Sequence, residues 1–84
     1  AASEPVQAPA TGIVVFRADI GDRVKAGDVI AEIVDPMTGT VTQAKSPTDG
    51  LMFARISLRF VTQGTRLAKV AGTKANRTGK LLGA

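Results

Sequence analysis

The sequence predicts an all-β domain, a flattened hybrid of a β-barrel and a β-sandwich that is built from two like halves. Short segments rich in β-branched residues alternate with Gly, Pro and Asp, as they do in small sandwiches and barrels. No window shows the 3.6-residue apolar period of a helix. The segments also recur at a nearly constant spacing, which indicates an internal repeat.

Two pairs of stretches match each other in the same order along the chain. Residues 8–17 align with residues 46–55 at a spacing of 38, and residues 27–33 align with residues 64–70 at a spacing of 37. The identical residues of the first pair are Pro9, Gly12 and Arg17 against Pro47, Gly50 and Arg55. The Pro suits the start of a strand because it has no N–H to donate, and the Gly is expected to adopt a positive φ. Two halves that each have an apolar face predict a pseudo-two-fold arrangement.

Six strands are expected, three in each half. They are residues 6–8, 13–17, 29–34, 40–44, 51–56 and 66–70. Residues 1–5 are expected to be a linker or tail, residues 6–71 the β-barrel domain, and residues 72–84 a flexible basic tail. The segment 56–61 is apolar for a loop, which indicates either core or a surface that meets another domain.

The composition excludes several classes of function. The chain has neither Cys nor His, so it has no disulfide, no zinc site of the usual ligands and no Ser-His or Cys-His nucleophile. The chain alone is therefore expected to catalyse no reaction and to hold no metal. No apolar run approaches the ~18 residues of a membrane span, and the N-terminus lacks the features of a secretory signal. A cytoplasmic location without membrane contact is expected.

Charge is distributed unevenly along the chain, whose net charge is +4. Residues 1–44 carry three basic and six acidic residues, whereas residues 45–84 carry eight basic residues and one acidic residue. A basic half attracts anionic ligands or an acidic neighbouring surface. The basic residues are not interleaved with aromatic ones and no RNA-binding signature occurs, so a nucleic-acid-binding barrel ranks last and no nucleic-acid partner is expected.

Residues 20–33, which read IGDRVKAGDVIAEI, resemble the G-D-x-V-x-x-G-D run of the biotinyl/lipoyl-domain superfamily. Gly21 and Gly27 are expected to form tight turns around Val24, which would fill the interior of the barrel. The Asp that follows each Gly is expected to accept hydrogen bonds from nearby backbone amides. The resemblance implies a biotinyl/lipoyl-type fold.

Carrier domains of that superfamily hold their cofactor on a lysine at the tip of the hairpin that links the halves. The resemblance places that position at Met37, and the next lysine downstream is Lys45. Because Met has no amine that could form the amide, no cofactor is expected on this chain. A carrier-like or adaptor binding module remains the alternative. Adaptors of the membrane-fusion type insert a long coiled coil between the halves, whereas the link here is only residues 34–40.

Four motifs together resemble the C-terminal domain of the succinylglutamate desuccinylase/aspartoacylase family. They are V-x-A-P-x-x-G at residues 6–12, G-D-x-V-x-x-G-D at residues 21–28, I-V-D-P-x-x-G-x-V at residues 33–41 and S-P-x-D-G at residues 46–50. The hairpin motif discriminates best, because carrier domains place the modified lysine there. The resemblance implies a preceding catalytic domain that binds zinc through a His-x-x-Glu pair and a distant His, and that hydrolyses the amide bond of N-acyl amino acids.

The resemblance further implies that this chain is a non-catalytic accessory domain that narrows the channel to the zinc. The expected partners are the protein's own N-terminal catalytic domain and, through it, an acidic small-molecule substrate. An Arg fork binds carboxylates in a bidentate manner. The candidates for contact with the substrate channel or the catalytic domain are Arg55, Arg59, Arg66, Asp35 and Met37.

Overall fold

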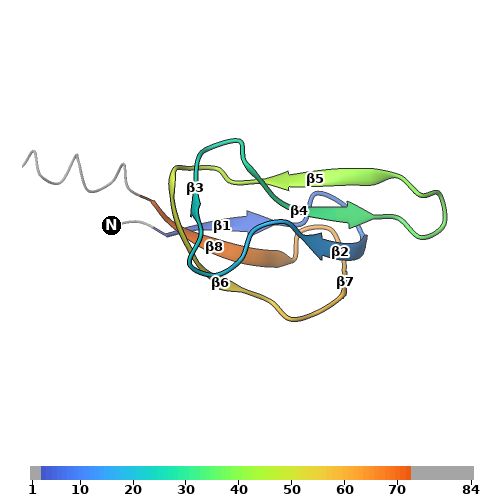
Figure 1. The fold of residues 1–84 in the computed structure, drawn as a ribbon. Coiled ribbons are helices and arrows are strands. Elements are labelled where there is room, and N and C mark those ends of the chain that lie inside the picture. Colours follow the sequence, from blue (N-terminus) through green and yellow to red (C-terminus); the bar gives the residue numbers. More distant parts are fainter. Residues whose placement is uncertain (1–2, 73–84) are drawn as a thin grey trace, which may run out of the picture.

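Two antiparallel four-stranded sheets pack face to face in the computed structural model, which describes residues 3–72 (Figure 1). The strands are β1 (Ser3–Gln7), β2 (Gly12–Phe16), β3 (Arg23–Val24), β4 (Val29–Val34), β5 (Val41–Lys45), β6 (Gly50–Arg55), β7 (Phe60–Val61) and β8 (Arg66–Gly72). Sheet A has the order β1-β8-β6-β3, and sheet B has the order β5-β4-β2-β7. The all-β prediction is confirmed. The sheets do not join into a closed barrel, so the fold is a flattened sandwich.

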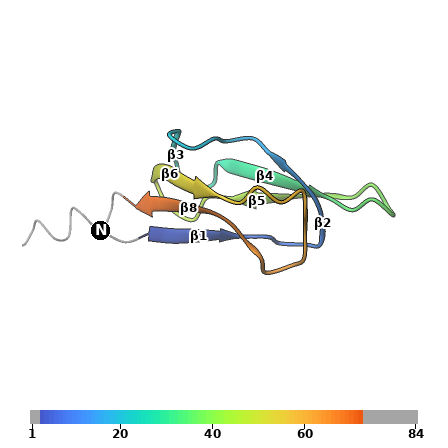
Figure 2. The ribbon, with the colours of Figure 1, turned by 90° about the horizontal axis from the view of Figure 1, so that it is seen from below.

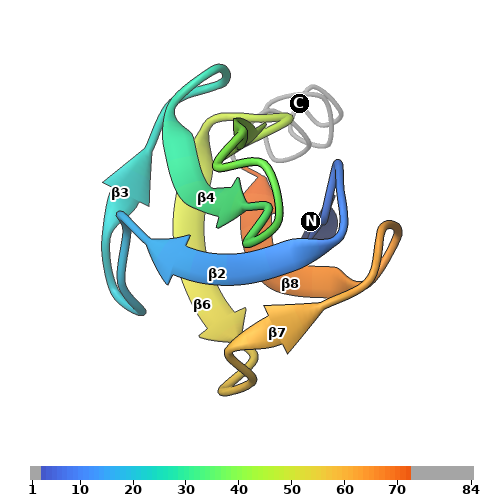
Figure 3. The same ribbon diagram turned by 90° about the vertical axis from the view of Figure 1, so that its right-hand side faces the viewer.

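The two halves of the chain exchange strands between the sheets. Each strand of sheet A has its repeat partner in sheet B, four strands away along the chain: β1 corresponds to β5, β8 to β4, β6 to β2 and β3 to β7. With these substitutions the strand order of sheet A becomes that of sheet B. Each sheet therefore contains two strands from each half, and neither half has a sheet of its own. Figure 3 faces one end of the sandwich and shows β4, β2 and β7 following one another in sheet B. The order confirms the internal repeat and its pseudo-two-fold symmetry.

Matching backbone hydrogen bonds connect the halves. The Gly64 amide donates to the Ala8 carbonyl at 2.9 Å, and the Gly27 amide donates to the Ser46 carbonyl, also at 2.9 Å. The two glycines have φ values of 92° and 93°, which Gly adopts without the strain that a side chain brings. The second Gly of each half is thus a turn residue, as its sequence context predicts.

Gly12 and Gly50 were expected to adopt a positive φ. Neither does, so that prediction was wrong. A Cβ on Gly12 would collide with the carbonyl oxygen of Val34 on the adjacent strand, and a Cβ on Gly50 would collide with that of Ala71. Both positions need Gly because two backbones approach closely there.

The match between Arg17 and Arg55 in the sequence repeat does not hold in the structure. β6 is one residue longer than β2, and its pairing with β8 contains a register shift. The extra residue moves Arg55 to the place in the ladder that Phe16 occupies in β2. Arg17 instead forms an ion pair with Glu32 at 2.7 Å. A bulge of this kind cannot be recognised from identical residues at a fixed spacing.

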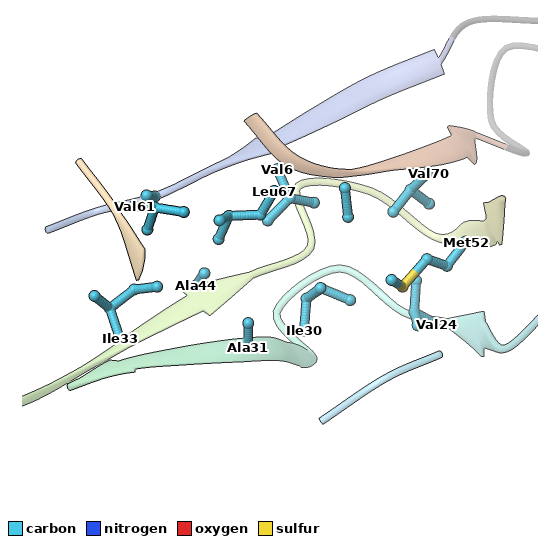
Figure 4. Packing of buried hydrophobic residues seen from close by; sticks show 12 residues of the cluster. Val6, Val24, Ile30, Ala31, Ile33, Ala44, Met52, Val61, Leu67 and Val70 are labelled. Atoms are coloured by element: carbon cyan, nitrogen blue, oxygen red, sulfur yellow. The ribbon is translucent and has the colours of Figure 1, made fainter. Parts of the chain in front are cut away.

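The core lies between the sheets, and both halves contribute to it (Figure 4). Met52 points toward Val24 and Ile30 at one end, whereas Ile33 and Val61 lie together at the other (Figure 4). The largest fully buried side chains of the core are those of Ile30, Ile33, Met52, Leu67 and Val70. Burying each such side chain contributes about 1.5–3 kcal/mol to folding.

Val24 and the two aspartates of residues 20–33 have the local roles that were expected of them. Val24 is 7% exposed and belongs to the core. The Asp22 carboxylate accepts a hydrogen bond from the Asp19 amide at 2.8 Å, and the Asp28 carboxylate accepts one from the Lys25 amide at 2.9 Å. These aspartates stabilise turns, as was expected.

The element boundaries differ from the prediction at a few places. β1 begins at Ser3, within the expected tail, and pairs with β8 from that residue onward. The two-residue strands β3 and β7 were not predicted, because two residues are too few to show a period. Most of the predicted basic tail lies outside the described residues. Among residues 3–72, the structure has no helix of the length and apolarity that a membrane crossing takes.

Candidate functional site

The five predicted site residues lie in three places on the sandwich. Arg55 and Arg59 line one groove, Arg55 and Arg66 line a smaller hollow, and Asp35 and Met37 belong to the β4–β5 hairpin. The structure therefore brings the two first-named arginines together and separates them from the hairpin residues.

The groove that Arg55 and Arg59 share has a volume of about 500 Å³. It lies between β2 and the loop that leads from β6 to β7, drawn in yellow to orange along the lower edge of Figure 1. Its lining residues are Val14, Phe16, Ile20, Arg55, Ile56, Ser57, Leu58 and Arg59. We call this feature the arginine groove. Apolar walls with a few charged groups are typical of small-molecule sites.

Arg55 is held at the wall of the groove by two contacts. Its guanidinium carbon lies 4.8 Å from the centre of the Phe16 ring, which is a cation–π distance. Its Nε lies 3.5 Å from Oδ1 of Asp19. Because the Asp19 side chain is 72% exposed, this ion pair contributes little to stability. The contacts orient Arg55 and offset part of its charge.

Arg59 is anchored through its backbone and not through its side chain. Its carbonyl accepts a hydrogen bond from the Val14 amide at 2.7 Å, which ties the β6–β7 loop to β2. Within the described residues, no ion pair or aromatic contact engages its guanidinium. Arg59 is therefore the cation of the arginine groove whose charge is not offset by a neighbour. Five N–H donors in a planar fork suit it to a carboxylate.

Arg66 begins β8 and is exposed. The hollow it shares with Arg55 has a volume of about 160 Å³, smaller than the arginine groove, and its lining is mostly apolar. Arg66 does not line the arginine groove. It therefore provides a control for substitutions of the arginines that do.

The β4–β5 hairpin projects beyond both sheets, at the end opposite the start of β1 (Figures 1 and 2). The Asp35 carboxylate accepts a hydrogen bond from the Met37 amide at 2.8 Å, and the Gly39 amide donates to the Asp35 carbonyl at 2.7 Å. Gly39 has a φ of 78°. These bonds form an Asx-type turn that holds Met37, 89% exposed, at the tip. Lys45 lies at the other end of β5, paired with Val29.

A second open hollow, of about 420 Å³, lies at the base of this hairpin. It is lined largely by hydroxyl and amide groups, with Asp35 as its charged residue. Its lining residues are Ala10, Thr11, Ile33, Asp35, Thr38, Thr40, Thr42 and Gln63. These side chains can form hydrogen bonds with a polar neighbour. None of the lining residues is a base of the kind that activates a hydroxyl nucleophile.

Sequence reasoning missed the apolar wall of the arginine groove. Ile20 is 56% exposed and Leu58 is 60% exposed, and both line the groove. Ile20 belongs to a motif that was interpreted as turn chemistry alone. The apolar character of residues 56–61 was the one signal for Leu58. The expected core role is confirmed for Val61, which is buried. Leu58 is exposed, and contact of this segment with another domain stays a prediction.

The fold and the groove define a class of domain, a two-sheet β-sandwich from duplicated halves with a basic groove at one side. No family model and no curated protein matches the sequence. Solved structures do match. One is a succinylglutamate desuccinylase/aspartoacylase family protein from Shewanella amazonensis SB2B, with 28% identity and a TM-score of 0.77 over 84% of this chain. Another, from Shewanella frigidimarina NCIMB 400, has 24% identity and a TM-score of 0.74 over 84% of this chain.

A third match is the ectoine utilization protein EutE (DoeB) from Ruegeria pomeroyi, with 24% identity and a TM-score of 0.75 over 82% of this chain. In its structure, this chain corresponds in fold to one domain of succinylglutamate desuccinylase/aspartoacylase family proteins. It spans 20% of the two Shewanella chains and 22% of the Ruegeria chain. Most of each matched protein therefore has no counterpart in these 84 residues.

Proposed function

We propose that this chain is the C-terminal accessory domain of a zinc-dependent hydrolase that cleaves the amide bond of N-acyl amino acids. The observation that carries the proposal is the agreement in fold with one part of proteins about four times as long as this chain. The domain contributes to substrate binding and leaves bond cleavage to the rest of the polypeptide. Its location is cytoplasmic.

The side chains available as metal ligands support a division in which this domain binds substrate and another domain cleaves the bond. Zinc hydrolases hold the metal with three protein ligands, of which His is the commonest, and keep one position open for water. This chain has no His and no Cys, so its residues do not fit such a centre. Zinc would instead be held by the catalytic domain that we propose to precede this one, and there it would supply a Lewis acid for amide hydrolysis.

The arginine groove supports a role in substrate binding. N-acyl derivatives of acidic amino acids carry carboxylates beside the amide bond, and Arg59 presents a guanidinium whose charge is not offset. Arg55, held against Phe16, adds a second positive charge to the same wall. A carboxylate at the mouth of the channel is stabilised by such donors and is bound there before the amide reaches the metal.

The test is a hydrolysis assay on the full-length protein encoded by the complete reading frame. We expect it to cleave N-succinyl or N-acetyl derivatives of glutamate and aspartate faster than those of leucine. We expect the activity to be lost on zinc chelation and restored by added zinc. A reading frame without a further domain, or a full-length protein that cleaves none of these amides, would contradict the proposal.

A further inference from the structure

A continuous row of apolar side chains, three of them exposed, crosses the outer face of sheet B. Phe60 pairs with Ile13, Ile13 pairs with Val34, and Val34 pairs with Val41, so the row spans β7, β2, β4 and β5 in direct register. Directly paired residues point to the same side of a sheet. Their alternate neighbours Ile33 and Val61 face the core (Figure 4), which places this row on the outside. We call these four residues the apolar row.

Most side chains of the apolar row are exposed to solvent although they are apolar. Phe60 is 54% exposed, Val41 is 52% exposed and Ile13 is 40% exposed, whereas Val34 is partly buried. Val15, two residues beyond Ile13 on the same strand face, is 37% exposed and widens the patch. Contiguous exposed apolar surface of this kind marks a site of contact with another protein surface.

The internal repeat supplies a comparison within the same molecule. On the outer face of sheet A, the equivalent positions are Arg23, Leu51, Ala71 and Ser3, paired in the same register. That row has Arg and Ser at its two ends and retains a single large apolar side chain. The two sheets have the same strand order, so the fold itself does not demand an apolar row across an outer face. Sheet A also exposes Leu51 and Phe53, at 41% and 44%, but its paired row does not continue as large apolar side chains onto the neighbouring strands.

We propose that the apolar row is the surface on which the remaining polypeptide of the larger protein docks. The proposal rests on the proposed function in one respect, namely that the protein contains further chain. The matched proteins are about four times as long as this chain. The expected occupant is an apolar surface of the adjoining domain, with the exposed ion pair of Arg17 and Glu32 at the rim.

The position of the row fits the arginine groove. Phe60 at one end of the row follows Arg59 directly in the chain, and Val41 at the other end begins β5 at the foot of the hairpin. A domain that docks on the row is therefore brought beside the arginine groove on one side and the hairpin on the other. Docking of this kind places Arg59 at the edge of the interface, where a substrate channel between two domains opens.

Hydroxyl-radical footprinting of the full-length protein tests the proposal with two phenylalanines of the same chain. Phe53 lies on sheet A and is 44% exposed, against 54% for Phe60, so the two rings would be oxidised at similar rates if nothing covered either. We expect Phe60 to be oxidised at least about fivefold more slowly than Phe53, because interface cores exclude water. Equal rates would overturn the proposal.

A matched pair of variants sharpens the result. Ile13 and Leu51 are equivalent in the repeat and are 40% and 41% exposed. We expect Ile13→Lys to raise the oxidation rate of Phe60 to that of Phe53, and Leu51→Lys to leave Phe60 protected. Equal effects of the two variants would contradict the assigned face.

Two further outcomes separate this inference from its alternatives. Protection of Phe60 that disappears on dilution would show a second copy of the chain on the row and would overturn the assigned occupant. Protection that persists on dilution in a full-length protein without amide hydrolase activity would support the docking surface while the proposed function fails.

Discussion

The two glycines that start β2 and β6 show how one atom decides a backbone contact. At both Gly12 and Gly50, the missing Cβ leaves room for a carbonyl oxygen of the adjacent strand. The sequence repeat identified these two positions, yet turn chemistry was the wrong explanation for them. A Pro-x-x-Gly motif predicts that Gly is required and does not reveal whether conformation or space is the reason.

Gly12→Ala and Gly50→Ala are each predicted to lower the free energy of unfolding by about 3 kcal/mol, because the added methyl group displaces backbone. Gly39→Ala is the control. Its Cβ would meet nothing within 4 Å, so the positive φ alone costs about 1 kcal/mol. Urea denaturation of the three variants measures the difference. A Gly12→Ala variant as stable as Gly39→Ala would contradict the steric explanation.

The candidate arginines were predicted from the family resemblance and the basic second half of the chain, and the structure shows which of them line the same groove. Arg55 and Arg59 came together because a loop after β6 folds back on β2, which no sequence spacing indicates. The basic second half and the apolar residues 56–61 were the readable signals. The apolar partner Ile20 comes from the first half, so its place in the groove depends on tertiary structure alone.

At the scale of elements, the long strands were predictable and the short ones were not. The six expected strands correspond to β1, β2, β4, β5, β6 and β8, with boundary shifts of a few residues. β3 and β7 each have two residues and exist because partner strands are beside them. The bulge in β6 is likewise a property of pairing with β8, and local sequence does not specify it.

The hairpin permits a direct test of the carrier alternative. Met37 occupies the exposed tip, and the lysine of β5 lies at the far end of its strand. Co-expression with biotin ligase and lipoate ligase is predicted to leave the intact mass of the chain unchanged, because the tip has no amine to acylate. A Met37→Lys variant serves as the control for whether the ligases accept this hairpin. A mass increase of the unaltered chain by one biotinyl or lipoyl group would contradict the prediction.

For the whole molecule, the repeat predicts the architecture, and our proposals about function concern the places where the repeat is broken. The interchangeable strand orders follow from the duplicated sequence. Three features break the symmetry, namely the arginine groove, the projecting hairpin and the apolar row. The resemblance carried by the four motifs is confirmed by agreement with solved structures of the family. The amide hydrolysis and the zinc that we propose for the larger protein have no counterpart among these residues, which include no His and no Cys, so they stay proposals that the sequence cannot place.

The most direct measurement is the steady-state kinetics of the full-length protein with Arg59→Gln, using an N-acylated acidic amino acid as substrate. In the proposed function Arg59 binds substrate and takes no part in bond cleavage, so loss of its charge-assisted hydrogen bond predicts a rise in KM of about tenfold with little change in kcat. Arg66→Gln, which removes a charge outside the arginine groove, is predicted to leave both constants within about twofold. Unchanged KM in Arg59→Gln, or equal changes in the two variants, would contradict a substrate-binding role for this domain.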